Sequence, residues 1–159
     1  MDYFYNYLKS IDKNINIYID MDGVVADYDA LSYLTNKEES NVYLKKRPVT
    51  TTIKILEKVS TLPNVTLNIL SCTRHINQID GKIKWLKENM SFIKENNINI
   101  ISREEKNYSK AKEFKRDFLK KNIKDNIFTI LIDDSHEVID EVLRLNSNIL
   151  PLHISSILD

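Results

Sequence analysis

The stretch Ile15-Asn16-Ile17-Tyr18-Ile19-Asp20-Met21-Asp22-Gly23 decides the fold of this chain. Residues 15–19 are mostly β-branched or aromatic and show no helical period, which predicts a short buried β-strand. The strand delivers two carboxylates, Asp20 and Asp22, and ends at Gly23. Two carboxylates one residue apart do not stay buried and charged unless a cation joins them. Because hard oxygen ligands suit Mg²⁺, this stretch predicts a strand that ends at a divalent-cation site.

Strands and helices alternate along the rest of the chain. Further strands are predicted at residues 65–71, 98–101, 127–132 and about 148–152. Helices are predicted at residues 2–9, 27–35 and 49–61, around Leu86, after Ser109 as N-cap, and around Val142, while residues 72–78 form a loop. This alternation is typical of an α/β fold, here a doubly wound, Rossmann-like parallel sheet of about five strands in a single domain of residues 1–159.

Composition narrows the class of protein. The 159 residues carry 23 Lys and Arg against 23 Asp and Glu, so no global charge points to nucleic acid or to a membrane surface. Apolar runs are only a few residues long, which excludes a transmembrane helix, and the N-terminus has no secretory signal pattern. The single cysteine, Cys72, cannot form an internal disulfide. We therefore expect a cytoplasmic protein; nothing in the sequence indicates its oligomeric state.

Polar residues recur at the ends of three predicted strands. They are Asp20 and Asp22, Ser71, and Asp133 with Asp134. Parallel strands end at one edge of a sheet, so these side chains are expected to converge on one pocket. Taken singly, each has an ordinary structural explanation as a turn or helix-capping residue. Taken together, acidic pairs at two strand ends repel each other unless a cation lies between them, which favours a metal site.

Three of these segments resemble the motifs of a known superfamily. Asp20-Met21-Asp22-Gly23-Val24-Val25-Ala26-Asp27 resembles the first motif of the haloacid dehalogenase-like (HAD) phosphohydrolases, in the form found in the 5'(3')-deoxyribonucleotidase branch and its small phage and bacterial relatives. Ile69-Leu70-Ser71 resembles the second motif, and Leu131-Ile132-Asp133-Asp134 resembles the fourth, acidic motif. The resemblance covers about residues 15–150.

The resemblance implies a role for each of these polar residues. Asp20 is expected to attack phosphorus and form an aspartyl-phosphate, while Asp22 acts as general acid and then as general base. Ser71 is expected to donate a hydrogen bond to a phosphoryl oxygen. The implied cofactor is Mg²⁺, bound by Asp20, by Asp22 through its carbonyl, and by Asp134 with Asp133 beside it. Which of the last two binds the metal directly stays open.

The family also has a lysine that balances the charge of the nucleophile and the phosphate. The basic stretch of residues 103–124 offers many candidates, most of which are expected on a solvated helix face. A helix that follows a strand begins at the active-site edge, and its side chains lean towards its N-terminus. We therefore favour Lys110, directly after the Ser109 cap, and rank Lys115 second because it lies more than a turn deeper.

Substrate specificity in this superfamily comes from an insertion that caps the pocket. Here the insertion is expected at about residues 27–47, as a small helical cap. The candidates for substrate contact within it are Tyr28, Tyr33, Tyr43 and Arg47. Arg74 lies just past Ser71, in a loop that is expected to overhang the pocket. An arginine there suits the substrate's own phosphate or a second one, although a solvent-facing arginine is an equal alternative.

The leading hypothesis is a Mg²⁺-dependent phosphomonoesterase that acts on a small phosphate monoester, a nucleoside monophosphate. An alternative is a polynucleotide 3'-phosphatase, similar to the phosphatase domain of phage-type polynucleotide kinases. The basic helix favours that alternative, but the balanced net charge argues against strong binding to nucleic acid. A third hypothesis is a non-catalytic binding protein with the same fold. The intact set of Asp20, Asp22, Ser71, the candidate Lys110 and Asp134 argues against it.

Overall fold

The computed structural model describes residues 3–28, 42–145 and 148–158. The strands are β1 (Asn14–Ile19), β2 (Val65–Thr73), β3 (Ile98–Ser102), β4 (Ile127–Asp133) and β5 (Ile149–His153). The α-helices are α1 (Tyr3–Lys9), α3 (Thr50–Val59), α4 (Ile79–Asn89), α5 (Arg103–Lys106), α6 (Ala111–Asn122) and α7 (His136–Leu143). Single 3₁₀ turns lie at η1 (Val42–Lys45), η2 (Ile76–Gln78), η3 (Glu95–Asn97) and η4 (Ile154–Ile157).

The five strands form one parallel sheet in the order β3-β2-β1-β4-β5, which confirms the predicted fold class. The strand β1 lies at the centre, with Ile19 level with Ile69 of β2 and Ile132 of β4. From β1 the chain first builds outward through β2 and β3, and then returns to add β4 on the other side. Ligands of open α/β sheets bind at such a reversal of strand order, beyond the carboxyl ends of the strands.

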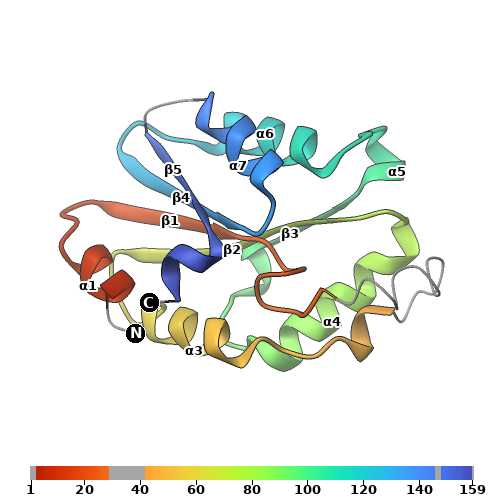
Figure 1. The fold of residues 1–159 in the computed structure, drawn as a ribbon, viewed down its shortest axis with the longest axis horizontal. Helices are drawn as coiled ribbons and strands as arrows, with labels where there is room; N and C mark the ends of the chain where they lie inside the picture. The colour runs from red at the N-terminus through yellow and green to blue at the C-terminus, as the bar shows by residue number, and fades with distance from the viewer. Residues whose placement is uncertain (1–2, 29–41, 146–147, 159) are drawn as a thin grey trace.

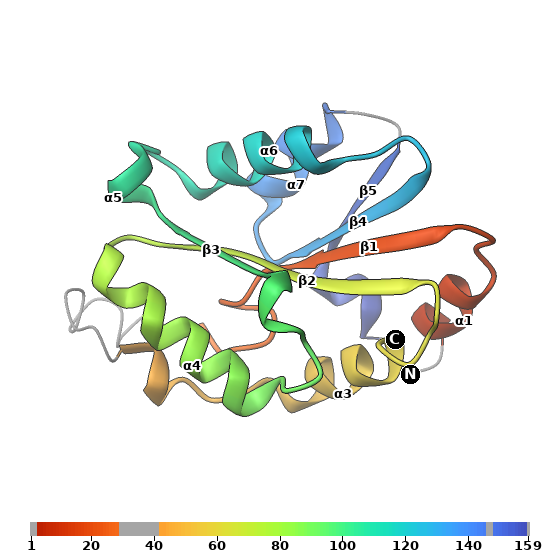
Figure 2. The same ribbon diagram turned by 180° about the vertical axis from the view of Figure 1, so that it is seen from behind.

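Helices cover both faces of the sheet (Figures 1 and 2). The helices α6 and α7 lie on one face, and α1, α3 and α4 lie on the other. Side chains of the central strand alternate between the two layers: Tyr18 packs in the cluster under α6 and α7, whereas Ile17 and Ile19 pack in the cluster over the other helices. A strand with apolar side chains on both faces is buried, as its sequence predicted.

Two boundaries differ from the predicted ones in ways that affect the site. The strand β2 continues through Cys72 to Thr73, paired with β3, where a loop was predicted. The N-cap of α6 is Lys110 rather than Ser109, and the Glu113 carboxylate accepts hydrogen bonds from the backbone N–H groups of both. Most of the helix predicted at residues 27–35 lies outside the described residues. Within the described ranges, no helix is long and apolar enough to cross a membrane.

Candidate active site

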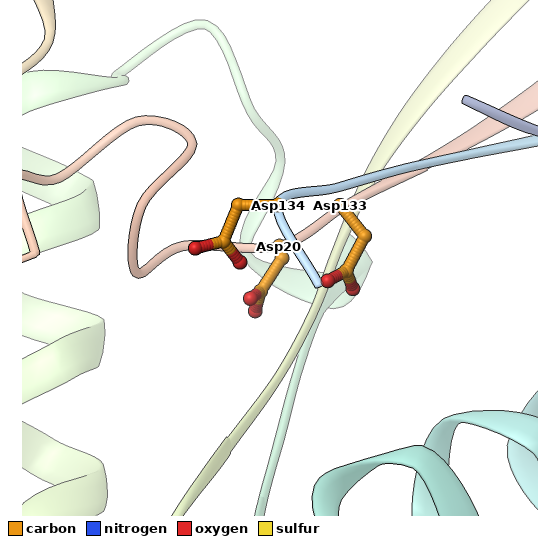
Figure 3. A group of neighbouring side chains, drawn as sticks. All are labelled: Asp20, Asp133 and Asp134. Atoms are coloured by element: carbon orange, nitrogen blue, oxygen red, sulfur yellow. The ribbon is translucent and has the colours of Figure 1, made fainter. Parts of the chain in front are cut away.

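Three carboxylates meet at the reversal of strand order (Figure 3). Asp20 directly follows β1, Asp133 is the last residue of β4, and Asp134 comes next. Their side chains offer oxygen atoms that all lie within 4.8 Å of one another. Because β1 and β4 are neighbours in the sheet, the two predicted acidic motifs lie side by side although more than a hundred residues separate them in sequence.

Asp20 is held by two hydrogen-bond donors from different elements. The Ser71 hydroxyl of β2 donates to Asp20 Oδ1 over 2.9 Å, and the Lys115 ammonium of α6 lies 3.1 Å from the same oxygen. The Asp20 residue is only 8% exposed. Both contacts fall on one oxygen, which leaves the other oxygen of this nearly buried carboxylate for a ligand.

The lysine beside Asp20 is Lys115, which we ranked second, and not Lys110. The Lys110 side chain is 58% exposed and its ammonium faces Glu137 over 3.6 Å. Lys115 is buried, and its ammonium lies between Asp20 and Asp133. The leaning of helix side chains towards the N-terminus, which we used to favour Lys110, instead carries the four-carbon chain of Lys115 back to the strand ends.

Asp133 and Asp134 have different surroundings. The Asp133 carboxylate is fully engaged, because Oδ2 accepts from Lys115 over 2.6 Å and Oδ1 accepts from the backbone N–H of Ser135 over 2.9 Å. Burial raises the pKa of Asp133 to about 6, against the opposing effect of Lys115. Asp134 forms no ion pair within the described part of the chain. Its pKa is raised by burial and by the nearby charge of Asp20.

These surroundings fit a bound cation. Asp134 and Asp20 repel each other, and a divalent cation between them would remove that repulsion. Gly23 leaves room for the Asp134 carboxylate beside Asp20, because a Cβ on residue 23 would collide with that carboxylate. Its φ of +78° is also in the left-handed region. Asp20 and Asp134 are therefore the carboxylates that could hold a metal directly, whereas Asp133 positions Lys115.

The second acid of the first motif, Asp22, is held by two lysines. Lys46, after η1, contacts Oδ1 over 2.9 Å, and Lys82 of α4 donates to Oδ2 over 2.6 Å. Burial favours the neutral acid, but the two ammonium groups outweigh it, so the pKa of Asp22 is lowered. Its carboxylate is therefore ionised in this arrangement.

Lys82 is a site residue that the sequence reasoning missed. Its side chain is fully buried, and its ammonium donates to Asp22, to Ser71 Oγ over 2.8 Å and to the Cys72 carbonyl over 2.9 Å. Because the ammonium only donates, Ser71 must accept from Lys82 and spend its single hydrogen on Asp20. The signal was present: Lys82 lies on the buried stripe of α4, three residues before Trp85.

A cavity of about 340 Å³ opens above these residues. The predicted residues Tyr28, Tyr43 and Arg74 line it, together with Arg103 and Thr73, neither of which was among our candidates. Arg47 does not line the cavity, contrary to our expectation: its side chain is 88% exposed and its guanidinium pairs with Asp27 over 3.0 Å. This ion pair joins the two ends of the segment predicted as the cap, residues 27–47. Tyr33 lies outside the described residues.

Comparisons with known proteins bear on the fold. No protein-family model matches the sequence, and no curated protein matches it. A chain in the structure of the Pnkp1/Rnl/Hen1 RNA repair complex is similar with a TM-score of 0.63 and 15% identity, over 90% of this chain but only 45% of that one. The HAD domain of effector protein Lem4 from Legionella pneumophila is 20% identical over 89% of this chain and 84% of that one, with a TM-score of 0.49. Its inactive mutant is 19% identical over the same shares, with a TM-score of 0.50.

At these identities the likeness concerns the fold alone. The protein spans less than half of the chain from the RNA repair complex and most of the Lem4 domain. Its parallel sheet with helices on both faces is the α/β fold that the sequence predicted.

Proposed function

We propose that this chain is a Mg²⁺-dependent phosphomonoesterase that uses Asp20 as its nucleophile and a nucleoside monophosphate as its substrate. The setting of Asp20 carries the proposal. A hydroxyl donor, an ammonium group and the unpaired acid Asp134 surround one carboxylate whose second oxygen is left for a ligand. A structural ion pair needs only a single cation, whereas this set of groups suits a carboxylate that reacts with an anion.

The reaction proceeds in two steps that both change bonds at phosphorus. The free oxygen of Asp20 first forms a bond to phosphorus, while the ester P–O bond breaks and the leaving oxygen takes a proton from Asp22. A water molecule then attacks phosphorus and gives its proton to Asp22. The bond between phosphorus and Asp20 breaks, which releases inorganic phosphate and restores the carboxylate.

The neighbouring residues stabilise charge on the transferred group. Ser71 and Lys115 donate to Asp20 in the free site. When a substrate binds, both would turn these donors to the phosphoryl oxygens, with Ser71 oriented by Lys82. A Mg²⁺ ion held by Asp20 and Asp134 would supply further charge neutralisation and hold the reacting groups in line. The ionised state of Asp22 suits its role as base in the second step. As acid in the first step, it must take up a proton against Lys46 and Lys82.

The nucleoside part of the proposal depends on the aromatic wall of the cavity. The Tyr28 ring is 62% exposed at the cavity, and the Tyr43 ring is buried beside it. The Lys46 ammonium lies 5.8 Å and 5.7 Å from the two ring centroids and 2.9 Å from Asp22 Oδ1, so both rings lie near that carboxylate. Flat aromatic surfaces next to a phosphate site suit a base or sugar joined to that phosphate.

One assay tests the proposal. Phosphate release is measured over deoxynucleoside and ribonucleoside monophosphates and sugar phosphates, with Mg²⁺ or with EDTA. We expect turnover of nucleotides that EDTA abolishes, and no turnover by Asp20→Asn, whose circular dichroism spectrum matches that of the wild type. Absence of Mg²⁺-dependent turnover on every substrate would leave the non-catalytic binding protein as the better hypothesis. Substantial activity of Asp20→Asn would remove Asp20 from the nucleophile role.

A further inference from the structure

A second cavity adjoins the catalytic one. It has a volume of about 560 Å³ and lies between the end of β2 and the segment that joins α5 to α6. Arg74 and Arg103 line both cavities, so the two spaces meet at these arginines. We call the second cavity the side groove. A substrate that reaches beyond the catalytic cavity in this direction passes the two guanidinium groups.

Neither guanidinium is neutralised by a carboxylate within the described ranges. Arg74 is exposed and its side chain has no described partner, although its carbonyl accepts from the Ser102 hydroxyl. Arg103 is half-buried, and its Nη1 donates to the Ser109 carbonyl over 3.2 Å. That bond orients the group but leaves its charge uncompensated. The acid that lines the side groove, Glu104, instead lies 3.3 Å from His75 Nδ1.

A third group at the same place is left without a hydrogen-bond partner. Thr73 is the last residue of β2 and only 1% exposed, and its hydroxyl has no partner in the part of the chain that is described. It lines the catalytic cavity directly before Arg74. A buried hydroxyl without a partner is unfavourable. Its position between Ser71 and Arg74 therefore points to a ligand that accepts a hydrogen bond there.

The wall of the side groove is aromatic and fixed. Tyr108 lines it, and its ring packs against Phe114 with 5.9 Å between centroids. The Tyr108 hydroxyl donates to Asp117 over 3.3 Å, which holds the ring in one orientation. A nucleobase stacks on such a ring without regard to its identity.

We infer that the substrate carries a second phosphate, one nucleoside away from the phosphate that is removed, and that Thr73, Arg74 and Arg103 bind it. Two guanidinium forks and a hydroxyl match the oxygens of a phosphate ester. The nucleoside beyond it lies in the side groove against Tyr108. This inference rests on the proposed phosphatase function, and it replaces the simple nucleoside monophosphate by a nucleotide that carries a further phosphate. The second phosphate belongs either to a nucleoside bisphosphate or to a short 3'-phosphorylated oligonucleotide.

The test compares substrates that differ only in the second phosphate. The value of kcat/KM is measured for adenosine 3'-monophosphate, adenosine 3',5'-bisphosphate and a 3'-phosphorylated tetranucleotide, on the wild type, Arg74→Gln and Arg103→Gln. Arg144→Gln is the matched control, because that side chain is 78% exposed at the far end of α7 and borders neither cavity. Affinity for the same three compounds is measured by calorimetry on Asp20→Asn, which does not consume them.

We expect the second phosphate to raise kcat/KM about tenfold to a hundredfold, the range of one or two charged hydrogen bonds. Arg74→Gln and Arg103→Gln should each reduce this ratio, whereas Arg144→Gln should leave it unchanged. Preference for the bisphosphate or for the oligonucleotide identifies the source of the second phosphate. Equal kcat/KM for all three substrates, or a ratio that both arginine variants retain, would overturn the inference. If no compound is hydrolysed, the phosphatase proposal fails, and the affinity ratio alone decides the second site.

Discussion

Replacing Lys115 by Met is the sharpest test of the site, and replacing Lys110 by Met is its matched control. Lys110 is the N-cap of α6 and Lys115 lies five residues later in that helix, and Met keeps the length of the side chain. In the wild type the Lys115 ammonium lies 3.1 Å from Asp20 and 2.6 Å from Asp133, and all three side chains are buried. The Lys110 ammonium is exposed and 3.6 Å from Glu137, which is itself exposed.

The structure predicts very different magnitudes for the two variants. Removal of one partner from a buried ion pair costs about 3–5 kcal/mol of folding stability, because it leaves an uncompensated charge. Lys115→Met leaves the carboxylates of Asp20 and Asp133 without their shared cation. Proton uptake by Asp133, whose pKa is raised, limits the loss of folding stability. Lys110→Met removes an exposed pair, which contributes little to stability because water screens it. Loss of a group that stabilises charge at the reacting centre lowers kcat by about 10²–10³, which applies to Lys115 alone.

Urea unfolding at pH 7 measures the stability of both variants, and phosphate release with Mg²⁺ measures their activity. Lys115→Met should be the less stable and should lose nearly all turnover, while Lys110→Met should resemble the wild type in both. To separate folding from catalysis, activity is measured where urea curves show that the variant is folded. The assignment would be refuted if Lys110→Met lost more activity than Lys115→Met, or if folded Lys115→Met kept turnover near that of the wild type.

Three further predictions concern the carboxylates of the site. Asp134→Asn should stabilise the metal-free protein, because it removes an unpaired charge beside Asp20. It should also abolish the rise in Tm that we expect Mg²⁺ to cause in the wild type. Asp140→Asn, on the exposed side of α7, should keep that rise; a Mg²⁺-dependent Tm in Asp134→Asn would contradict the metal assignment. Gly23→Ala should cost about 1–2 kcal/mol in a chemical unfolding experiment, since φ is +78° there, and should also weaken Mg²⁺ binding in calorimetry because the new Cβ displaces Asp134. A Gly23→Ala variant with wild-type stability and Mg²⁺ affinity would show that neither the left-handed conformation of residue 23 nor the room it leaves for Asp134 matters. The lowered pKa of Asp22 means that its ion pairs contribute stability above about pH 4, the pKa of an unfolded aspartate, and that this contribution is lost as the pH falls towards the folded-state pKa. The difference in unfolding free energy between wild type and Asp22→Asn should therefore shrink in acid; a constant difference down to pH 2 would argue against the pairing.

The sequence predicted the parts of the site that follow directly from strand ends. Asp20, Ser71 and Asp133 were placed correctly because a parallel sheet brings all its carboxyl ends to one edge, whatever the order of the strands. That inference needs only the strand positions, which the β-branched runs indicate well. Which residue of a helix reaches the strand ends is harder to predict, because it depends on where the helix lies over the sheet.

The lysines show where the sequence is insufficient. Lys115 was ranked second because it lies more than one turn after the N-cap of α6. That ranking underestimated how far its side chain reaches back towards the strand ends. Lys82 was missed because its partner Asp22 is 60 residues away in sequence. A single lysine on the buried face of a helix does not by itself indicate which acid it contacts. Lys46 contacts Asp22 from the segment after η1, a placement for which the sequence has no periodic signal.

The net charge of the site favours the binding of a divalent cation together with a phosphate over the binding of either one alone. Four carboxylates, on Asp20, Asp22, Asp133 and Asp134, meet three ammonium groups, on Lys46, Lys82 and Lys115. Each lysine contacts at least one of the first three acids, so the net negative charge falls on Asp134. A divalent cation alone would reverse the sign of the site, and a phosphate dianion alone would raise its negative charge steeply. Bound together, the two leave the net charge as it was, which a buried site with fixed ion pairs tolerates best.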